Sequence, residues 1–479
     1  MLINLTIENF MSFDTSVSFS MEAGRKTSRH ENHVSNVNGI SVLRGAAIYG
    51  ANAAGKSNVL KAVDLFQQMI YLGECSILRG MQFALAATIR PDMRFDIVYS
   101  HEGNVFRYAV VTDGLSVKRE SLWSIKGEKE SILFDRENGT GLVFSDELEK
   151  AEWYRQRTLA DNMLYLPKLF SDGLVENRAN IAMSDVVMSA YLGLTSMFVL
   201  GSESRPRPGA FYHFIKQDEF KAFLLELLKR ADLGITDLSW EPLSVKEAEM
   251  IFSQHPFQGD GARVLGVSRG FYLIRRDASG ISGEEFRLQH NGVSLRAESE
   301  SDGTVRLIHL SPMLYQMYHS YGTWFIDEAD CHIHPVLMRY LLKTFMERRA
   351  NVTQLVITMH DTNLMTHDIW RTDEIWFAEK RLDGSSDLYS LYQFQPRHDK
   401  NLEKGYLQGL YGALPSLGGE MVYGKMTQTD AAISRAKAWV TTHGQFPECL
   451  NASHYAGIYP LVEKIRASPM VPAGSWRRR

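Results

Sequence analysis

The chain has 479 residues, of which 44% are hydrophobic and 23% are charged. These values are ordinary for a globular protein, and the length suggests two or three domains. The net charge of −4 excludes a general attraction to nucleic acid or to anionic membranes, although one local face can still be basic. No stretch approaches the ~20 apolar residues that a membrane span requires.

The first half of the chain alternates between strand patterns and one helix. A strand is expected at residues 2–8, and residues 20–40 are polar and loop-like. A short apolar strand at 46–49 precedes a helical pattern that ends near Tyr71. Between Met93 and Phe134, short alternating runs separated by polar turns predict an antiparallel meander.

The second half is helical at first and then returns to strands. Residues 145–235 are mostly helical, with a Pro/Gly/Ser break near Gly201–Gly209, and residues 236–295 consist of strands and turns. Two apolar strands, 324–326 and 354–358, flank a helix and predict a buried parallel sheet. The sequence contains no internal repeat and no long heptad run. We therefore expect four regions, which are 1–144, 145–235, 236–395 and 396–479.

The cysteines and the first residues indicate the compartment. Cys75, Cys331 and Cys449 are far apart and form no C-x-x-C pair, which argues against a zinc module or a disulfide framework. The opening residues alternate like a strand and do not resemble a signal peptide. We therefore expect a cytoplasmic protein without a membrane segment.

The most informative motif is a complete G-x-x-x-x-G-K-[ST] phosphate loop between the strand at 46–49 and the following helix. In such a loop, backbone N–H groups and the helix N-terminus bind phosphate. Lys56 is expected to contact the β- and γ-phosphates, and the Ser57 hydroxyl to ligate Mg²⁺. The sequence therefore predicts a site for ATP and Mg²⁺. The expected ATP-binding residues are Gly50, Asn52, Ala53, Ala54, Gly55, Lys56, Ser57 and Asn58.

Two acidic residues follow the apolar strand at 324–326. Asp327 is expected to organise the Mg²⁺ shell, and Glu328 to polarise the attacking water. By itself, an Asp-Glu pair after a strand more often lies in a solvated loop. Downstream of a phosphate loop, the same pair indicates a hydrolytic site. His360 follows the next strand on the side where parallel sheets bind ligands, so it is expected to contact the γ-phosphate.

A small polar turn precedes the apolar helix that starts near Leu307. A serine hydroxyl, a glycine N–H and a helix start can together bind an anion. Such a turn is common by itself, and its position about twenty residues before the acidic strand makes it informative. The turn contains Ser301, Asp302, Gly303 and Thr304.

In this order the motifs resemble the ABC-type ATPase head of SMC-like, RecF-like and OLD-like ATPases. The start Ile7–Phe13 is similar to their I-x-N-F-x-S-F opening, and Asp330–Pro335 resembles their D-loop. Residues 360–364, 402–407 and 411–415 resemble AAA-family proteins of abortive-infection and anti-phage loci. The resemblance covers about residues 1–418 and implies an α/β head with a mixed or parallel sheet, an antiparallel β subdomain and a helical insertion.

The resemblance also implies partners. Two heads would pair head to tail, so that ATP at Lys56 of one head contacts Ser301 and Gly303 of the other, with Asp330 as the D-loop residue. A homodimer, or a higher oligomer built from dimers, is therefore expected. Gln82 is a weak candidate for the glutamine metal ligand of such heads, and that role stays unassigned.

We expect no nuclease centre, because His443 and His454 lack acidic and asparagine partners at useful spacing. In the defence systems that the chain resembles (PARIS, Septu and retron-linked loci), the ATPase controls a separate effector, often a nuclease or toxin, in response to a phage-derived trigger. This predicts a slow ATPase that acts as a sensor or scaffold for a companion effector.

One alternative is a DNA-binding repair or maintenance ATPase of the RecF or SMC type. The missing coiled-coil arm and the net charge count against it, and a transporter subunit is a weaker third reading. A local basic surface could still contact DNA phosphates, although solvated helix faces and strand edges are the simpler interpretation. The residues concerned are Arg155, Arg157, Lys229, Arg230, Arg275, Arg276, Arg348 and Arg349.

Overall fold

The computed structural model describes most of the chain up to Met421. The described residues are 1–24, 29–86, 90–127, 129–137, 141–144, 159–176, 181–201, 208–231, 234–267, 269–347, 353–397, 399–417 and 420–421. They form two compact units. The first contains Met1–Leu200, Gly322–Glu328 and the chain from Met346 onward, and the second contains Gly201–Tyr321 and Ala329–Phe345.

A six-stranded, mostly parallel sheet forms the centre of the first unit. Its strand order is β11-β17-β18-β5-β19-β20, and only β20 runs antiparallel to its neighbour. Every residue of β5, β17 and β18 is buried, which explains the apolar run in each of these strands. The strands are β5 (Gly45–Tyr49), β11 (Met197–Leu200), β17 (Gly322–Ile326), β18 (Thr353–Thr358), β19 (Ile375–Lys380) and β20 (Ser386–Ser390).

A seven-stranded antiparallel sheet is the second layer of this unit, with the order β10-β9-β8-β7-β6-β1-β2. The expected meander forms its larger part. Helix α1 (Lys56–Leu72) packs on it, since Phe66 contacts Phe95 and Tyr108. The strands are β1 (Leu2–Glu8), β2 (Val17–Ser20), β6 (Met93–His101), β7 (Asn104–Thr112), β8 (Val117–Lys126), β9 (Lys129–Glu137) and β10 (Gly141–Phe144).

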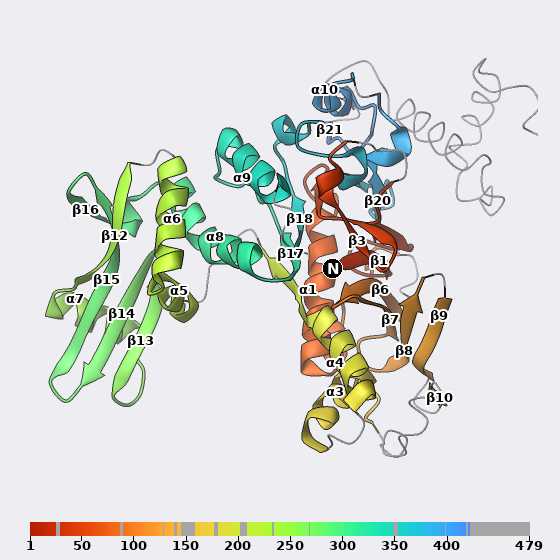
Figure 1. Cartoon of the computed structure of the whole chain (residues 1–479), viewed down its shortest axis with the longest axis horizontal. Helices are drawn as coiled ribbons and strands as arrows, with labels where there is room; N and C mark the ends of the chain where they lie inside the picture. The colour runs from red at the N-terminus through yellow and green to blue at the C-terminus, as the bar shows by residue number, and fades with distance from the viewer. Residues whose placement is uncertain are drawn as a thin grey trace, which may run out of the picture. The chain divides into compact units, whose positions relative to one another are not determined.

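Helices α3 (Tyr165–Glu176) and α4 (Ile181–Thr195) lie beside α1, as Figure 1 shows. The start of α3 is held by a residue of the meander. The Glu120 carboxylate is fully buried and accepts hydrogen bonds from the N–H groups of Tyr165 (2.6 Å) and Leu166 (2.9 Å). A carboxylate at this position satisfies helix N–H groups that have no partner within the helix.

The second unit is built on a smaller antiparallel sheet, with the order β12-β15-β14-β13 and β16 paired to β15. Phe271 and Phe286 pack on Phe211 of α5 (Pro208–Ile215), whereas Tyr272 and Ile274 belong to a cluster with α7 (Val245–Gln254). Because adjacent side chains of a strand point to opposite faces, α5 and α7 cover opposite faces of this sheet. The strands are β12 (Ile235–Pro242), β13 (Gly261–Val267), β14 (Gly270–Asp277), β15 (Gly280–His290) and β16 (Val293–Arg296).

Several elements complete the two units. The remaining helices are α6 (Asp218–Arg230), α8 (Asp302–His319), α9 (Pro335–Glu347) and α10 (Leu402–Leu407). The remaining strands are β3 (Val34–Val37), β4 (Ile40–Leu43), β21 (Ser416–Leu417) and β22 (Glu420–Met421). The 3₁₀ turns are η1 (Glu31–His33), η2 (Ser76–Leu78), η4 (Ala297–Ser299), η5 (Thr362–Leu364), η6 (Thr372–Glu374) and η7 (Leu391–Phe394).

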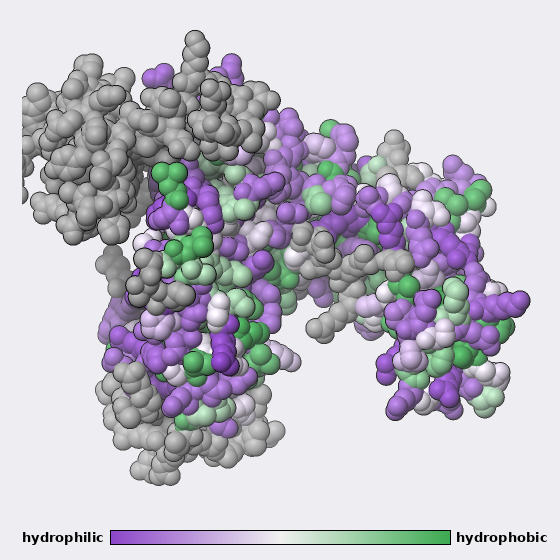
Figure 2. All heavy atoms as spheres, turned by 180° about the vertical axis from the view of Figure 1, so that it is seen from behind, coloured by the Kyte–Doolittle hydropathy of each residue, from purple (hydrophilic) through white to green (hydrophobic). Residues whose placement is uncertain are grey.

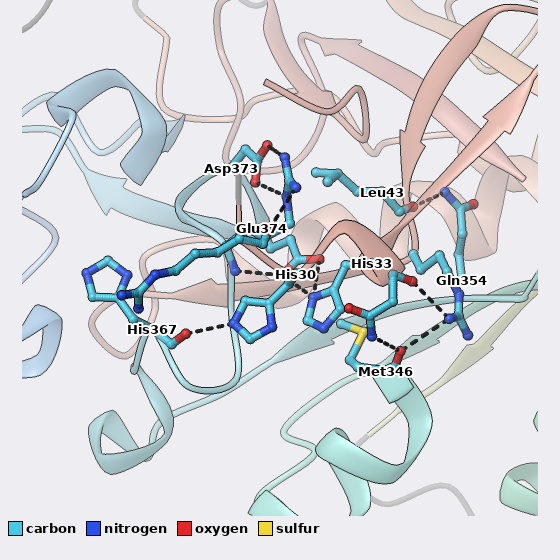
Figure 3. A network of polar contacts seen from close by, with 12 residues as sticks. His30, His33, Leu43, Met346, Gln354, His367, Asp373 and Glu374 are labelled. Atoms are coloured by element: carbon cyan, nitrogen blue, oxygen red, sulfur yellow. Dashed lines mark hydrogen bonds and ion pairs between the residues drawn. The ribbon is translucent and has the colours of Figure 1, made fainter. Parts of the chain in front are cut away.

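A buried polar network lies at the amino-terminal ends of β5 and β19, the end of the sheet opposite to the phosphate loop (Figure 3). His33 Nδ1 is 3.0 Å from both carboxylate oxygens of Glu374, and Arg371 donates its backbone N–H to the same carboxylate. Burial lowers the pKa of His33 to about 4, and burial raises the pKa of Glu374 well above its usual value. Arg371 also donates to Asp373 through its guanidinium.

The expected fold class is confirmed, namely an α/β head with a mixed sheet and an antiparallel β subdomain. Three local features were not expected. Residues 34–43 form the β3–β4 hairpin rather than a loop, the mostly helical region contributes β11 to the parallel sheet, and α7 interrupts the second-unit strands. The described chain contains no helix that is long and apolar enough to span a membrane. On the face in Figure 2, hydrophobic side chains form small groups among hydrophilic ones.

Candidate active site

The phosphate loop connects β5 to α1, and its geometry explains its glycines. Gly50 (φ 149°), Ala53 (φ 60°) and Gly55 (φ 106°) all have positive φ, and Gly55 is the N-cap of α1. The two glycines have no β-carbon and adopt such angles without strain, whereas Ala53 holds an angle that is unfavourable for a residue with a β-carbon. The Lys56 ammonium donates to the carbonyl oxygens of Gly50 (2.9 Å) and Ala51 (3.0 Å), so it lies inside the curve of the loop.

Neighbouring strands and loops hold the phosphate loop from outside. A β-carbon on Gly50 would lie 2.2 Å from the Ala378 carbonyl oxygen of β19. A β-carbon on Gly55 would lie 2.6 Å from the Ser386 hydroxyl and 2.9 Å from the Ser12 hydroxyl. Both glycines are therefore required by close packing as well as by backbone angle.

A segment near residue 413 also supports the phosphate loop, a role that no sequence pattern predicts. The Ala51 N–H donates to the Ala413 carbonyl oxygen (3.1 Å), which also accepts a hydrogen bond from the Tyr406 hydroxyl (3.1 Å). The Ala413 N–H donates to Glu379 of β19 (3.1 Å). The resemblance of residues 402–407 and 411–415 to a family pattern gives no indication of contact with the phosphate loop.

Asp327 follows β17 and meets the phosphate loop as expected. The Ser57 hydroxyl donates to Asp327 Oδ1 (3.0 Å), although β18 lies between β17 and β5 in the sheet. The Thr358 hydroxyl donates to the same oxygen (2.5 Å). A serine hydroxyl beside a carboxylate matches the oxygen ligands that Mg²⁺ prefers, so Ser57 and Asp327 fit the expected metal site.

Glu328 and His360 lie together on the same side of the sheet. Glu328 Oε1 is 3.6 Å from His360 Nε2, and both side chains are partly exposed, at 39% and 42%. Glu328 has φ 48°, an unfavourable backbone angle for a non-glycine residue. The Glu328 N–H donates to the Thr358 hydroxyl (2.7 Å), which holds the chain in that conformation.

Glu328 and His360 line one pocket of about 640 Å³ together with the phosphate loop, whereas Gly50 and Asp327 are not among its lining residues. That volume is within the usual range for sites that bind small molecules. The lining also contains Lys61, which lies one turn of α1 beyond Ser57 and belongs to no sequence motif. The pocket is lined by Asn52, Ala53, Ala54, Gly55, Lys56, Ser57, Asn58, Lys61, Glu328 and His360. Two lysines, a helix N-terminus and loop N–H groups favour a polyanionic ligand.

The expected signature turn, 301–304, and the D-loop residue Asp330 belong to the second unit. All residues that line the described pocket belong to the first unit. Ser301 caps α8, because its hydroxyl accepts the Thr304 N–H (3.2 Å). Asp302 forms an ion pair with Arg269. A β-carbon on Gly303 would lie 2.7 Å from the His332 carbonyl oxygen, so the turn packs against the segment that starts at Asp330.

Gln82, the weak candidate metal ligand, makes other contacts. Its side-chain amide donates to the carbonyl oxygens of Pro91 (3.1 Å) and Asp113 (2.9 Å), and Gln82 does not line the pocket. Among the basic residues considered for DNA contact, Arg230 pairs with Glu226 and Arg275 pairs with Glu284. Four others, Arg155, Arg157, Arg348 and Arg349, lie outside the described residues, as do His443 and His454.

Comparison with known proteins identifies the domain. Residues 46–366 match the family model described as "AAA domain, putative AbiEii toxin, Type IV TA system". A search of curated proteins finds no match. Similar solved structures include the SmcHead bound to the C-winged helix domain of ScpA, at 16% identity and a TM-score of 0.38, covering 81% of this chain and 97% of that one.

The SMC head domain from Thermotoga maritima is also similar, at 12% identity and a TM-score of 0.36, covering 81% of this chain and 98% of that one. Both TM-scores are below 0.5, so the assignment depends on the family match, which spans more than half of the chain and contains the phosphate loop, Asp327, Glu328 and His360. The chain belongs to this family of AAA domains.

Proposed function

We propose that this protein binds Mg·ATP in the described pocket and hydrolyses it slowly. The observation that carries the proposal is the convergence of three strand ends. Lys56 and Ser57 follow β5, Asp327 and Glu328 follow β17, and His360 follows β18. A phosphate-binding loop, a metal-organising carboxylate and a carboxylate for water activation are the parts that phosphoryl transfer requires.

Each side chain has a separate task in this proposal. Lys56 would exchange its two carbonyl partners for the β- and γ-phosphates, while Ser57 and Asp327 would hold Mg²⁺. The bound metal would neutralise charge on the transferred phosphoryl group. Glu328 would accept the proton of the attacking water, and His360 would hydrogen-bond the γ-phosphate beside it.

We further propose that ATP joins two copies head to tail, with Ser301 and Gly303 of one copy completing the pocket of the other. The γ-phosphate would then favour the joined state, and hydrolysis would release it. The family description names a toxin–antitoxin context. It supports the proposal that this cycle holds or releases a companion effector in anti-phage defence, in the cytoplasm.

The alternative, a DNA-binding repair ATPase, has less support from the described residues. Arg230 and Arg275 already pair with carboxylates, and Arg276 lies over the ring of Phe252. Arg230 and Arg275 are exposed, at 52% and 40%, but their carboxylate partners offset their positive charge and so weaken the attraction of this surface to phosphates.

The test is purification of tagged Glu328→Gln protein in the presence of ATP from the cells that encode it, in parallel with and without nuclease treatment, with Lys56→Ala as the matched control. We expect Glu328→Gln to elute as a dimer or larger assembly with ATP, together with a stoichiometric protein partner that Lys56→Ala does not retain. Retention of nuclease-sensitive DNA in place of a protein partner would favour the repair ATPase. A monomer in both variants would contradict the head-to-tail proposal.

A further inference from the structure

Thr358, the last residue of β18, makes two hydrogen bonds through its hydroxyl. Its side chain is fully buried, and its hydroxyl accepts the Glu328 N–H (2.7 Å) and donates to Asp327 Oδ1 (2.5 Å). A backbone N–H can only donate, so the hydroxyl proton must point to the carboxylate. One hydroxyl therefore contacts both acidic residues of the proposed site from a neighbouring strand.

The contact with Glu328 supports a strained backbone. Glu328 has φ 48°, a conformation that is unfavourable for residues with a β-carbon and that persists only where surrounding contacts enforce it. This angle turns the chain sharply after Asp327 and directs the Glu328 side chain into the pocket beside His360. The Thr358 hydroxyl provides the hydrogen bond that holds this turn.

The contact with Asp327 orients the carboxylate. Asp327 Oδ1 accepts from both Ser57 (3.0 Å) and Thr358 (2.5 Å). Two hydroxyl donors on one oxygen restrict the orientation of the carboxylate. The Thr358 hydroxyl can keep its hydrogen bond to Asp327 if the Ser57 hydroxyl turns toward a metal ion. Outer contacts of this kind orient ligands and tune metal affinity.

We infer that Thr358 is a positioning residue that aligns the Asp327 carboxylate and the Glu328 backbone for Mg·ATP hydrolysis. The inference deepens the proposed function and rests on it. Thr358 touches no expected ligand atom, so its effect acts through its two acidic neighbours. Sequence alone would assign it to the buried strand, because threonine is common in strands.

The decisive variant is Thr358→Val, which keeps the shape of the side chain and removes the hydroxyl. We expect hydrolysis to fall about 10–100-fold and the Mg²⁺ concentration for half-maximal rate to rise, as for other outer-shell substitutions. ATP binding measured in EDTA should stay within about twofold of wild type, because the phosphate loop is intact. Thr358→Ser keeps the hydroxyl and should restore most of the activity.

Thr323 offers a matched control at the opposite end of the same sheet. Its buried hydroxyl also accepts a backbone N–H, from Leu2 (3.1 Å), and donates to a side-chain oxygen, of Gln354 (2.8 Å). Thr323→Val also removes a buried hydroxyl that accepts one hydrogen bond and donates another. Thr323 lies near the start of β17, whereas Asp327 and Glu328 follow the end of that strand. We expect it to lower the melting temperature while leaving the Mg²⁺ dependence unchanged.

Amide hydrogen exchange gives a readout that needs neither metal nor activity. In Thr358→Val the Glu328 amide should exchange faster, while amides within β17 keep their protection. Wild-type hydrolysis and Mg²⁺ dependence in Thr358→Val would overturn the inference, as would equal rate losses in Thr358→Val and Thr323→Val. If the wild-type protein hydrolysed no ATP, the proposed function would fail. Unchanged exchange at Glu328 would separately show that Thr358 does not hold that backbone.

Discussion

Gly50→Ala tests how tightly the phosphate loop is fixed by the strand beside it. Gly50 has φ 149°, and a β-carbon there would lie 2.2 Å from the Ala378 carbonyl oxygen. The obstructing atom is backbone within β19, which is paired with β5, so it cannot move aside as a side chain would. The substitution must therefore displace either the start of the loop or the strand.

Gly39→Ala separates backbone strain from this clash. Gly39 also has positive φ, at 87°, but a β-carbon there would meet nothing within 4 Å. Strain alone should make Gly39→Ala less stable by about 1–2 kcal/mol. For Gly50→Ala, strain of about 1–3 kcal/mol adds to overpacking of about 1–3 kcal/mol, which gives about 2–6 kcal/mol in total.

The assay combines urea unfolding, followed by tryptophan fluorescence, with equilibrium ATP binding. Gly39→Ala should bind ATP as wild type does, because its hairpin turn is not part of the pocket. Gly50→Ala should lose at least about tenfold in ATP affinity, a change of about 1.4 kcal/mol, because the loop N–H groups are displaced. Equal stability losses in the two variants, with unchanged ATP affinity in both, would refute the packing argument.

Three further predictions follow from single contacts. Tyr406→Phe removes the hydroxyl that donates to the Ala413 carbonyl oxygen and should lower the unfolding free energy by about 1 kcal/mol, measured by urea titration. Glu120→Ala should lower the unfolding free energy by about 1–3 kcal/mol, measured in the same way, because it removes the carboxylate that accepts from two N–H groups at the start of α3. The pKa of Asp113 is about 2, because hydrogen bonds from Lys118 and turn N–H groups outweigh the opposing effect of burial. The ionised Asp113 therefore stabilises the fold above the ordinary Asp pKa, and this stabilisation is lost as the pH falls through about 2. Between pH 4 and pH 2, the unfolding free energy of Asp113→Asn should therefore fall less than that of wild type.

The parallel sheet and its ligand-binding edge could be predicted because local sequence dictates them. The strands β5, β17 and β18 are buried on both faces, and each therefore contains an apolar run that the sequence makes visible. A phosphate loop requires glycines at fixed spacing, and Asp327 and His360 follow strands directly. Parallel strands end at one edge of the sheet, so the sequence was sufficient to bring these side chains together.

The supporting contacts could not be predicted, because they depend on pairing between distant segments. Ala413 contacts the phosphate loop through backbone atoms, which leave no trace in residue type. Strand β11 is only four residues long and follows a helix, so its sequence resembled a helix end. The buried pair of His33 and Glu374 joins residues 341 positions apart, and neither has a local pattern that marks it.

The turn that contains Ser301 and Gly303 was predictable in its residue types but not in its role. The family resemblance implies that Ser301 and Gly303 contact ATP bound to a second copy of the chain. Within one chain, both residues make local contacts. Ser301 caps α8, and Gly303 allows close packing against His332. These local contacts explain the residue types without a partner, so a role between two copies stays a prediction.

The most direct test of the central claim is a single-turnover measurement of ATP hydrolysis with Mg²⁺ by wild type, Glu328→Gln and Lys56→Ala. We expect slow conversion to ADP by wild type, a rate about 100-fold or more lower in Glu328→Gln with bound ATP retained, and no bound ATP in Lys56→Ala. Hydrolysis by Glu328→Gln at the wild-type rate would contradict the assignment of Glu328 as the base, and ATP binding by Lys56→Ala with wild-type affinity would contradict the site itself.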